Sequence, residues 1–331
     1  MGIKNLNRFL LDNCNKKSIT KIHLSKLSGK VLVIDVSIYL YKFLSEDALL
    51  ENMYLFISIL KKYDIKPIFI FDGKPPPEKK QLLIKRLGDK MEAEKKYLNI
   101  KEELLSEQNK EKKEEKLLEM ELLKKQFIRV KDDDLRKVKD LFDAYGVSYF
   151  VAPSEADQLC AYLNKNQQVW GCISDDMDMF LYGCKFVVRH ISLLNHTAVL
   201  YDRDKILSDL NMSSQIFNEI MILSGTDYNM NNETSLTETI KWYYEYMKYT
   251  EKEIKNNNKP YGFYLWLVKN TKYIKNYELL LRTYQIFQIE NDAGLNNFEV
   301  LAIDNDNSNA NTTNIDKLYN IMEKEGFLFV K

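Results

Sequence analysis

Histidine and paired cysteine are scarce in this chain. Its only three histidines, His23, His190 and His196, argue against a histidine-rich metal centre. Its four cysteines form no C-x-x-C pair; they are Cys14, Cys160, Cys172 and Cys184. This spacing argues against a zinc site or a disulfide framework, and it predicts a reducing, intracellular compartment.

Long apolar runs and an excess of either charge are also missing. No run approaches the ~18–20 apolar residues of a membrane span, so we expect no membrane partner. Residues 1–6 lack the apolar stretch of a signal peptide, and Leu6 stands where a myristoylation signal needs Ser or Thr. Lys plus Arg and Asp plus Glu each number 48, so the formal net charge is zero. Neutrality on its face disfavours nucleic acid as a partner, but net charge says nothing about distribution.

The composition is otherwise that of a folded protein. The 331 residues are 45% hydrophobic and 29% charged, which is enough for one large domain or two small ones. Three short apolar segments each end close to an aspartate: 31–34 before Asp35, 68–71 before Asp72, and 169–173 before Asp175 and Asp176. Such runs are typical of buried parallel strands. Because helical patterns at 54–62 and 156–163 lie between them, the sequence predicts an α/β fold.

Residues 78–131 differ in character from their surroundings. Of these 54 residues 16 are basic and 12 are acidic, and Gly88 is the only glycine or proline. The pattern predicts a solvated helical insertion, with a slight preference for facing phosphate because basic residues are in excess.

From about residue 206 the pattern turns helical. The predicted helical segments are 216–223, 240–249, 261–268 and 279–287. The Asn-rich stretch 304–314 superficially resembles a calcium loop. We reject that interpretation because Asn309 replaces the turn glycine and Ile315 replaces the closing glutamate.

The aspartates at the strand ends suggest a shared site. In an open α/β sheet, ligands bind outside the carboxyl ends of the strands, where Asp35, Asp72 and Asp176 would meet. Crowded carboxylates repel one another, and a hard divalent cation such as Mg²⁺ or Mn²⁺ would remove that repulsion. The alternative is that each aspartate is only a turn residue. From the residues alone, the two explanations are about equally supported.

Four other acids are ambiguous from the pattern: Glu155, Asp157, Asp178 and Asp227. Residues 154–157 are typical of a helix capping box, which would explain Asp157 as a cap. Asp176 and Asp178 share a face only in extended chain. Asp227 follows a helical segment and could be an ordinary turn residue. These four therefore stay candidates.

Taken in order, a series of segments resembles the flap endonuclease/XPG family of structure-specific 5′ nucleases. The matching segments are Met1-Gly2-Ile3 with Leu6, Val33-Ile34-Asp35-Val36-Ser37, Ile70-Phe71-Asp72-Gly73-Lys74-Pro75-Pro76, Ala152-Pro153-Ser154-Glu155-Ala156-Asp157, Asp175-Asp176-Met177-Asp178, Arg189-His190 and Leu223-Ser224-Gly225-Thr226-Asp227-Tyr228. The resemblance implies a PIN-like 5′-nuclease fold with a mostly parallel central sheet flanked by helices. It further implies a nuclease core at 1–228, a helical arch at about 78–131, and a helical C-terminal part at 229–331 packed on the core.

The resemblance also implies the site residues. The family's seven metal-binding carboxylates match Asp35, Asp72, Glu155, Asp157, Asp176, Asp178 and Asp227. Asp157 has a shorter side chain than the glutamate that the family usually has at this position. The family's chemistry implies two Mg²⁺ ions, for which Mn²⁺ can substitute, that activate water and stabilise both oxygens of an in-line displacement.

Four residues match the family's DNA contacts. Lys79 and Arg86 match arch residues that contact the scissile phosphate, where cations offset developing charge. Tyr41 matches an aromatic that stacks on a base, and the amine of Gly2 matches another DNA contact. Without the family, Lys79 and Arg86 would be exposed residues of a helix and Tyr41 a core aromatic.

Two departures from the family pattern limit the resemblance. After Asp227 the family has a Gly-x-Gly turn that grips duplex phosphate, whereas residues 235–238 here predict a capping box that starts a helix. Virus-encoded relatives show similar erosion, which favours a viral origin. The C-terminal residues 326–329 have aromatics but lack the glutamine of a clamp-binding tail, so we do not predict sliding-clamp binding.

The function implied is a Mg²⁺-dependent 5′ flap endonuclease on branched or 5′-flap DNA, with 5′-to-3′ exonuclease activity. We expect a monomer that serves replication, repair or recombination in a nucleus or at a viral replication site. Two alternatives stay open: a mainly exonucleolytic or RNA-directed 5′ nuclease, and a non-catalytic nucleic-acid-binding relative. Retention of all seven acids argues against the last.

Overall fold

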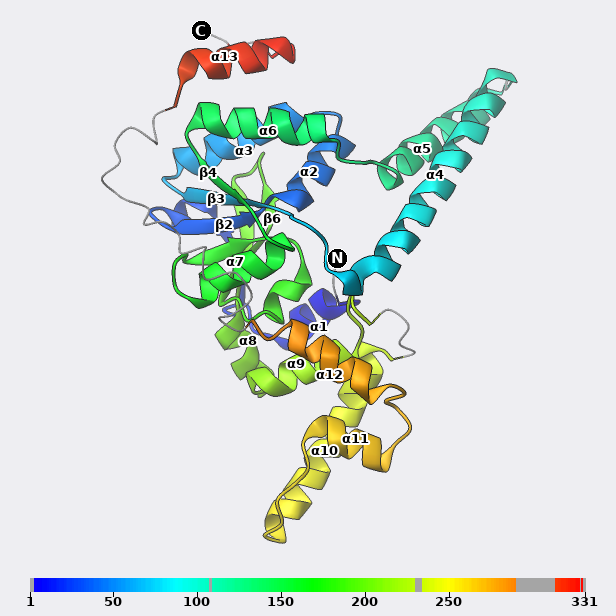
Figure 1. Ribbon diagram of the computed structural model, residues 1–331, viewed down its shortest axis with the longest axis vertical. Helices are drawn as coiled ribbons and strands as arrows, with labels where there is room; N and C mark the ends of the chain where they lie inside the picture. Colours follow the sequence, from blue (N-terminus) through cyan, green and yellow to red (C-terminus); the bar gives the residue numbers. More distant parts are fainter. Residues whose placement is uncertain (1–2, 107–108, 230–233, 290–312, 328, 330–331) are drawn as a thin grey trace.

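A computed structural model describes residues 3–106, 109–229, 234–289, 313–327 and 329 (Figure 1). Gly2 and the Asn-rich stretch up to residue 312 lie outside these residues. None of the described helices is long and apolar enough to cross a membrane.

A seven-stranded sheet forms the centre of the fold, in the order β1-β7-β6-β5-β2-β3-β4. The strands are β1 (Ile19–His23), β2 (Val31–Asp35), β3 (Lys66–Phe71), β4 (Ser148–Val151), β5 (Gly171–Ile173), β6 (Phe186–Ser192) and β7 (Thr197–Asp202). Strands β6, β5, β2, β3 and β4 are parallel, whereas β7 runs antiparallel to both β6 and β1. The predicted mostly parallel sheet is therefore confirmed.

Helices cover both faces of the sheet. They are α1 (Leu6–Asn13), α2 (Val36–Ser45), α3 (Leu49–Lys62), α6 (Asp132–Tyr145), α7 (Ala156–Lys165), α8 (Arg203–Asp209) and α9 (Ser214–Leu223). Strand β2 shows why its sequence is an unbroken apolar run: Leu32 and Ile34 pack with α2, α3 and α6, whereas Val33 packs on the other side with α1, α7 and α9. Both faces of the strand are buried, so polar alternation is absent.

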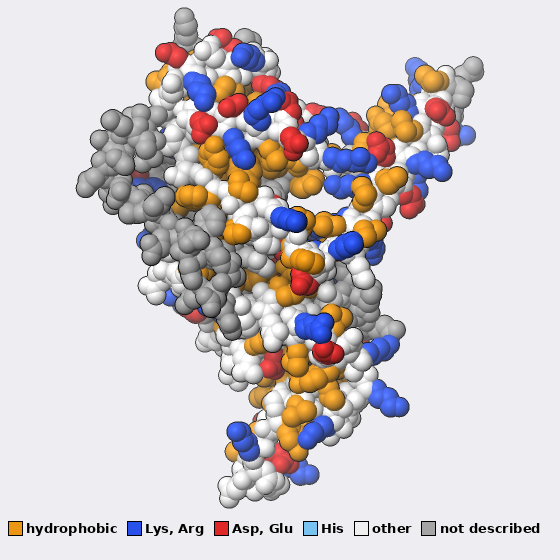
Figure 2. Space-filling model, in the orientation of Figure 1, with side chains coloured by type: hydrophobic (Ala, Val, Ile, Leu, Met, Phe, Trp, Pro, Cys, Tyr) orange, Lys and Arg blue, Asp and Glu red, His pale blue; other side chains and the backbone are white. Residues whose placement is uncertain are grey.

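The charged insertion is a helical hairpin that projects from the body (Figure 1). A short 3₁₀ turn, η2 (Pro77–Lys79), leads into α4 (Lys80–Ser106), and α5 (Lys110–Gln126) packs back along it. Basic, acidic and apolar side chains are interspersed over its surface (Figure 2). The exposed apolar ones on α4 include Ile84, Leu87 and Met91. The predicted solvated helical arch is present.

The C-terminal part is helical, as the sequence predicts. Its helices are α10 (Leu236–Lys255), α11 (Phe263–Asn270), α12 (Tyr277–Ile286) and α13 (Ile315–Lys324). The first three contact α9, whereas α13 lies against α6 (Figure 1). The Ser235 side chain accepts from the Glu238 N–H at 3.3 Å, so the N-cap of the predicted box is confirmed, whereas the Ser235 N–H donates to the Tyr273 hydroxyl. A domain boundary at residue 228 stays a prediction.

Candidate active site

The fold brings three strand-end aspartates to one edge of the sheet. Asp35 is the last residue of β2, Asp72 follows β3, and Asp176 lies just after β5. Because β5, β2 and β3 are adjacent parallel strands, their carboxyl ends meet there. Burial, then the charges of Asp72 and Asp176, raise the pKa of Asp35 to about 7. The charges of Asp72 and Asp176 are thus close enough to act on Asp35.

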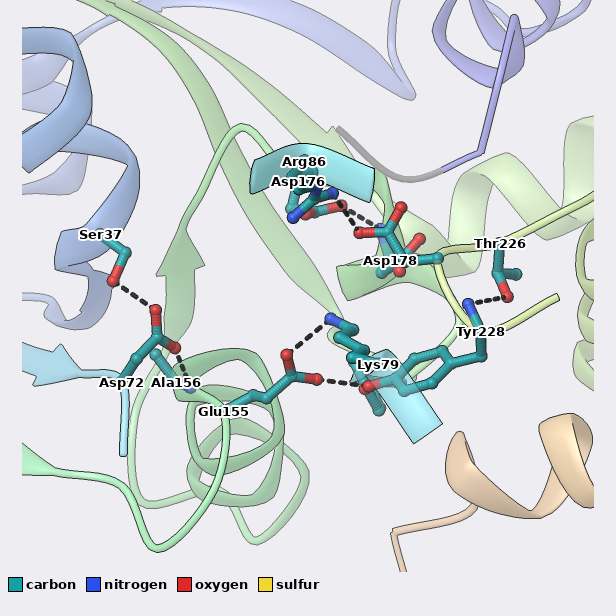
Figure 3. Close-up of polar contacts among 12 residues, drawn as sticks. Ser37, Asp72, Lys79, Arg86, Glu155, Ala156, Asp176, Asp178, Thr226 and Tyr228 are labelled. Atoms are coloured by element: carbon teal, nitrogen blue, oxygen red, sulfur yellow. Dashed lines mark hydrogen bonds and ion pairs between the residues drawn. The ribbon is translucent and has the colours of Figure 1, made fainter. Parts of the chain in front are cut away.

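Hydrogen bonds fix the orientation of the first two acids, and Figure 3 shows those of Asp72. Asp35 caps α2, its Oδ1 accepting from the Ser37 N–H at 3.0 Å. The Ser37 hydroxyl donates to Asp72 Oδ2 at 2.6 Å. Ser37 therefore links the acids of two strands, a role that sequence reasoning missed.

Asp72 also lies against the start of α7. Its Oδ1 accepts from the Ala156 N–H at 2.9 Å. Gly73 makes this approach feasible: its N–H donates to the Ser154 carbonyl at 2.7 Å, and a Cβ at Gly73 would lie 1.9 Å from the Ala152 oxygen. A side chain at this position would force the two segments apart.

The predicted capping box at residues 154–157 is wrong. The N-cap of α7 is Glu155, and no side-chain cap bond is formed by it. The carboxylate of Asp72 accepts from the N-terminus of α7 instead, so Asp157 does not act as a helix cap. Asp157 Oδ1 is buried without a hydrogen-bond partner, although the residue as a whole is partly exposed. Burial, then the charges of Asp35 and Asp176, raise the pKa of Asp157 well above its ordinary value.

Asp176 and Asp178 lie on a tight turn, not on extended chain. Asp176 caps the 3₁₀ turn η3 (Met177–Phe180), and its Oδ1 accepts from the Asp178 N–H at 3.0 Å. Asp178 is 2% exposed, and its Oδ1 has no partner. Burial, then the charges of Asp176 and Asp227, raise the pKa of Asp178 well above its ordinary value.

The loop that carries Asp227 is held by a buried asparagine. Asn229 Oδ1 accepts from the backbone N–H of Thr226 at 2.5 Å and from its hydroxyl at 2.8 Å. Asn229 Nδ2 donates to the Ile222 carbonyl at 2.8 Å. These bonds anchor the loop to the end of α9 and fix where Asp227 and Tyr228 emerge.

Two basic residues at the base of the arch face these acids (Figure 3). Lys79 Nζ lies 2.6 Å from Glu155 Oε1, and the Arg86 guanidinium donates to Asp227 Oδ2 at 2.8 Å. Burial alone would lower the pKa of Lys79, but Glu155, with Asp157 and Asp227, raises it overall. Lys79 is 8% exposed, so the alternative of an exposed helical lysine is wrong. The Arg86 side chain is 42% exposed.

The residue that matches the family's base-stacking aromatic lies at the surface. Tyr41 on α2 is 44% exposed, so the alternative of a core aromatic is wrong. Lys90 Nζ lies 4.9 Å from its ring centroid, a pairing that sequence reasoning missed. A second missed residue, Tyr228, touches both Glu155 and Lys79. Its place beside Asp227 in the sequence was the only available signal. Gly2 lies outside the described residues.

The donor set fits a hard divalent cation. The candidate ligands are all carboxylates, and the unpartnered Oδ1 atoms of Asp157 and Asp178 are buried acceptors that such an ion would satisfy. In the described part of the chain, no group of three or more His, Cys, Asp or Glu is arranged so that it could hold an ion. Glu155 and Asp227 face basic side chains instead. The carboxylate donors therefore suit a hard divalent cation. For them to bind one ion together, side chains such as Glu155 and Asp227 must turn away from their basic partners.

Comparison with known proteins identifies the family. An XPG N-terminal domain model matches residues 1–93 and an XPG I-region model matches residues 146–227. A probable RAD2-like endonuclease of Invertebrate iridescent virus 6 is 30% identical over 284 residues, covering 70% of this chain and 68% of that protein. The chain belongs to the XPG/flap endonuclease family of nucleases. The family predicted from the sequence is thereby confirmed.

Other members extend the comparison. Flap endonuclease 1 of Glycine max is 33% identical over 247 residues, which span 69% of this chain and 62% of the plant protein. The catalytic core of Rad2 in complex with DNA superposes with a TM-score of 0.63 at 19% identity, covering 98% of this chain and 96% of that one. Flap endonuclease-1 from Methanococcus jannaschii gives 0.53 at 22% identity, covering 93% and 97%. These structures confirm the 5′-nuclease fold.

Proposed function

We propose that this protein is a Mg²⁺-dependent, structure-specific 5′ nuclease that hydrolyses phosphodiester bonds at the 5′ flaps of branched DNA. The observation that carries the proposal is the meeting of carboxylates from separate elements with two basic residues at the base of the arch. Relatives that are named flap endonuclease 1 and RAD2-like endonuclease support the same activity.

The metal ligands that we propose are Asp35, Asp72, Glu155, Asp157, Asp176, Asp178 and Asp227. Two bound Mg²⁺ ions, or Mn²⁺ in their place, would lower the pKa of the attacking water and stabilise both oxygens of an in-line displacement. The protein's own part is orientation: Ser37 holds Asp35 and Asp72, and Asn229 holds the loop of Asp227.

Lys79 and Arg86 would bind the scissile phosphate and offset the charge that develops on it. Both already lie beside the acids, and neither needs to be brought from elsewhere in the chain. Their present partners, Glu155 and Asp227, would release them as phosphate enters. Tyr41 offers an exposed ring for base stacking, and Lys90 beside it supplies a cation for the adjoining phosphate.

We further propose a monomer that acts on DNA in replication, repair or recombination, in a nucleus or at a viral replication site. The viral relative supports the latter setting. The C-terminal aromatics give no support to clamp binding, because Phe327 and Phe329 pack against Tyr54 of the same chain, with ring centroids 5.2 and 5.9 Å away. Residue 228 remains the proposed end of the nuclease core.

The test compares three 5′-labelled substrates that share one duplex sequence: a 5′-flap DNA, a blunt duplex, and an RNA version of the flap strand. We expect cleavage in Mg²⁺ to be fastest on the DNA flap and to stop in EDTA. Cutting no faster at the branch than at the blunt end would reject the flap assignment. Preference for the RNA strand would instead favour an RNA-directed nuclease.

A further inference from the structure

Tyr228 contacts Glu155, Lys79 and Tyr182 through one side chain, and Figure 3 shows it beside the first two. It is 8% exposed, and its hydroxyl donates to Glu155 Oε2. The centroid of its ring lies 4.8 Å from Lys79 Nζ. Its hydroxyl also lies 3.2 Å from that of Tyr182, which comes from the segment after β5.

The direction of these hydrogen bonds is fixed by proton count. An ionised carboxylate can only accept, and each phenol has one proton to donate. The proton of Tyr228 therefore points to Glu155, and the Tyr182 hydroxyl must donate to Tyr228. The result is a chain from the buried Tyr182 and Tyr228 to the partly buried Glu155, in which each bond polarises the next.

The backbone of Tyr228 is held as firmly as its side chain. Its N–H donates to the Thr226 hydroxyl at 3.2 Å, inside the loop that Asn229 anchors. Lys79 in turn lies between two fixed groups, the Glu155 carboxylate and the face of the tyrosine ring. A cation over an aromatic face is held by the ring quadrupole, most strongly where water is excluded.

We propose that Tyr228 is a positioning residue, which orients the Glu155 carboxylate through the direct bond from its hydroxyl and places the Lys79 ammonium with its ring. This inference rests on the proposed function, in which Glu155 binds metal and Lys79 binds phosphate. It assigns two separate roles to one side chain within that function. The hydroxyl orients the Glu155 carboxylate, and the ring holds the Lys79 ammonium in place.

The test uses Tyr228→Phe, which keeps the ring and removes the hydroxyl. Tyr182→Phe is the matched control, because it removes a neighbouring buried hydroxyl whose hydrogen bond goes to Tyr228. Ca²⁺, a hard cation that carboxylates bind, is titrated calorimetrically into the DNA-free protein. Groups that orient a metal ligand typically contribute about 10–100-fold in affinity, so we expect at least a 10-fold weaker Kd in Tyr228→Phe. Tyr182→Phe should stay within about 3-fold of wild type, because the direct bond to Glu155 survives.

The kinetic readout separates positioning from folding. In Mg²⁺, Tyr228→Phe should lower kcat with little change in KM, and Tyr228→Leu should lower kcat further because Lys79 loses its aromatic face. Thermal midpoints and circular dichroism establish that each variant is folded. In a Glu155→Gln background, adding Tyr228→Phe should change Ca²⁺ affinity no further, since the two residues act as one unit.

Unchanged Ca²⁺ affinity in Tyr228→Phe would overturn the proposal, as would equal losses in Tyr228→Phe and Tyr182→Phe. A further loss in the Glu155→Gln background would show that Tyr228 does not act through Glu155, with the same consequence. A wild-type protein that cuts no DNA would refute the proposed function instead. The calorimetric result is independent of cleavage, so the two failures are distinguishable.

Discussion

At the scale of single residues, the site is built from carboxylates that destabilise the folded chain. The pKa values of Asp35, Asp157 and Asp178 are all raised by burial and by the charge of Asp176. Between the unfolded and folded pKa values, the folded state binds more protons than the unfolded state does. Stability from such a group is complete below the unfolded pKa and is lost as pH rises through the folded pKa.

For Asp35 this window runs from its ordinary pKa of 3.8 to about 7. We predict that in EDTA the thermal midpoint of wild type falls between pH 5 and pH 7.5 more steeply than that of Asp35→Asn. Adding Mg²⁺ should raise the wild-type midpoint more at pH 7.5 than at pH 5, because ionised carboxylates bind it. Differential scanning fluorimetry gives both comparisons. Parallel pH profiles for the two proteins would contradict the assigned repulsion.

A second residue-scale prediction concerns the base of the arch. Lys79→Ala and Arg86→Ala should each lower the single-turnover cleavage rate about 100-fold, because preorganised charges act mainly on the transition state. Flap affinity should change far less. Lys80→Ala is the matched control, an exposed lysine one position along the same segment. Equal rates for Lys79→Ala and Lys80→Ala would reject a catalytic role for Lys79.

At this scale, the sequence could not predict which side chains form hydrogen bonds and ion pairs with one another. The residue pattern at 154–157 favours a local cap, yet Asp72 from another strand takes the helix N-terminus. Lys79 has the charge of a surface residue, yet its burial depends on Glu155 and Tyr228, which lie far along the chain. Such partners become visible only when the strands are assembled.

At the scale of elements, the unbroken apolar runs predict the parallel strands β2 and β3 well. The antiparallel strands were missed. For β1, at residues 19–23, the partner is remote, at residues 197–202, and no local period encodes it, whereas β7 also pairs with its chain neighbour β6. The helices were better predicted, since their period of 3.6 is local.

The last helix offers a test of its own. In α13, Leu318 and Met322 are buried against the α6 side of the core, whereas Ile315 is 60% exposed. Leu318→Ala should lower the free energy of unfolding by about 3 kcal/mol, the usual effect of a cavity in a packed core. Ile315→Ala should change it by less than about 0.5 kcal/mol. Urea unfolding of the two variants measures both; equal effects would mean that α13 does not dock on α6.

At the scale of the whole molecule, the neutral net charge conceals local differences in charge. Acids gather at the carboxyl edge of the sheet, whereas the arch segment 78–131 has four more basic than acidic residues. Zero net charge is therefore compatible with binding DNA at one place, because local fields and not the sum attract phosphate. With few cations in excess, we expect a shallow dependence of duplex affinity on salt.

The central claim is that buried carboxylates at this edge make the chain a metal-dependent flap nuclease. Asp176 tests it most directly, because its charge acts on Asp35, Asp157 and Asp178 alike. The measurement is cleavage of a 5′-labelled DNA flap in Mg²⁺ by wild type, Asp176→Ala and the neighbouring control Asp175→Asn. The account predicts cleavage by wild type and the control, and none above the EDTA background by folded Asp176→Ala. Mg²⁺-dependent cleavage that survives in Asp176→Ala would contradict it.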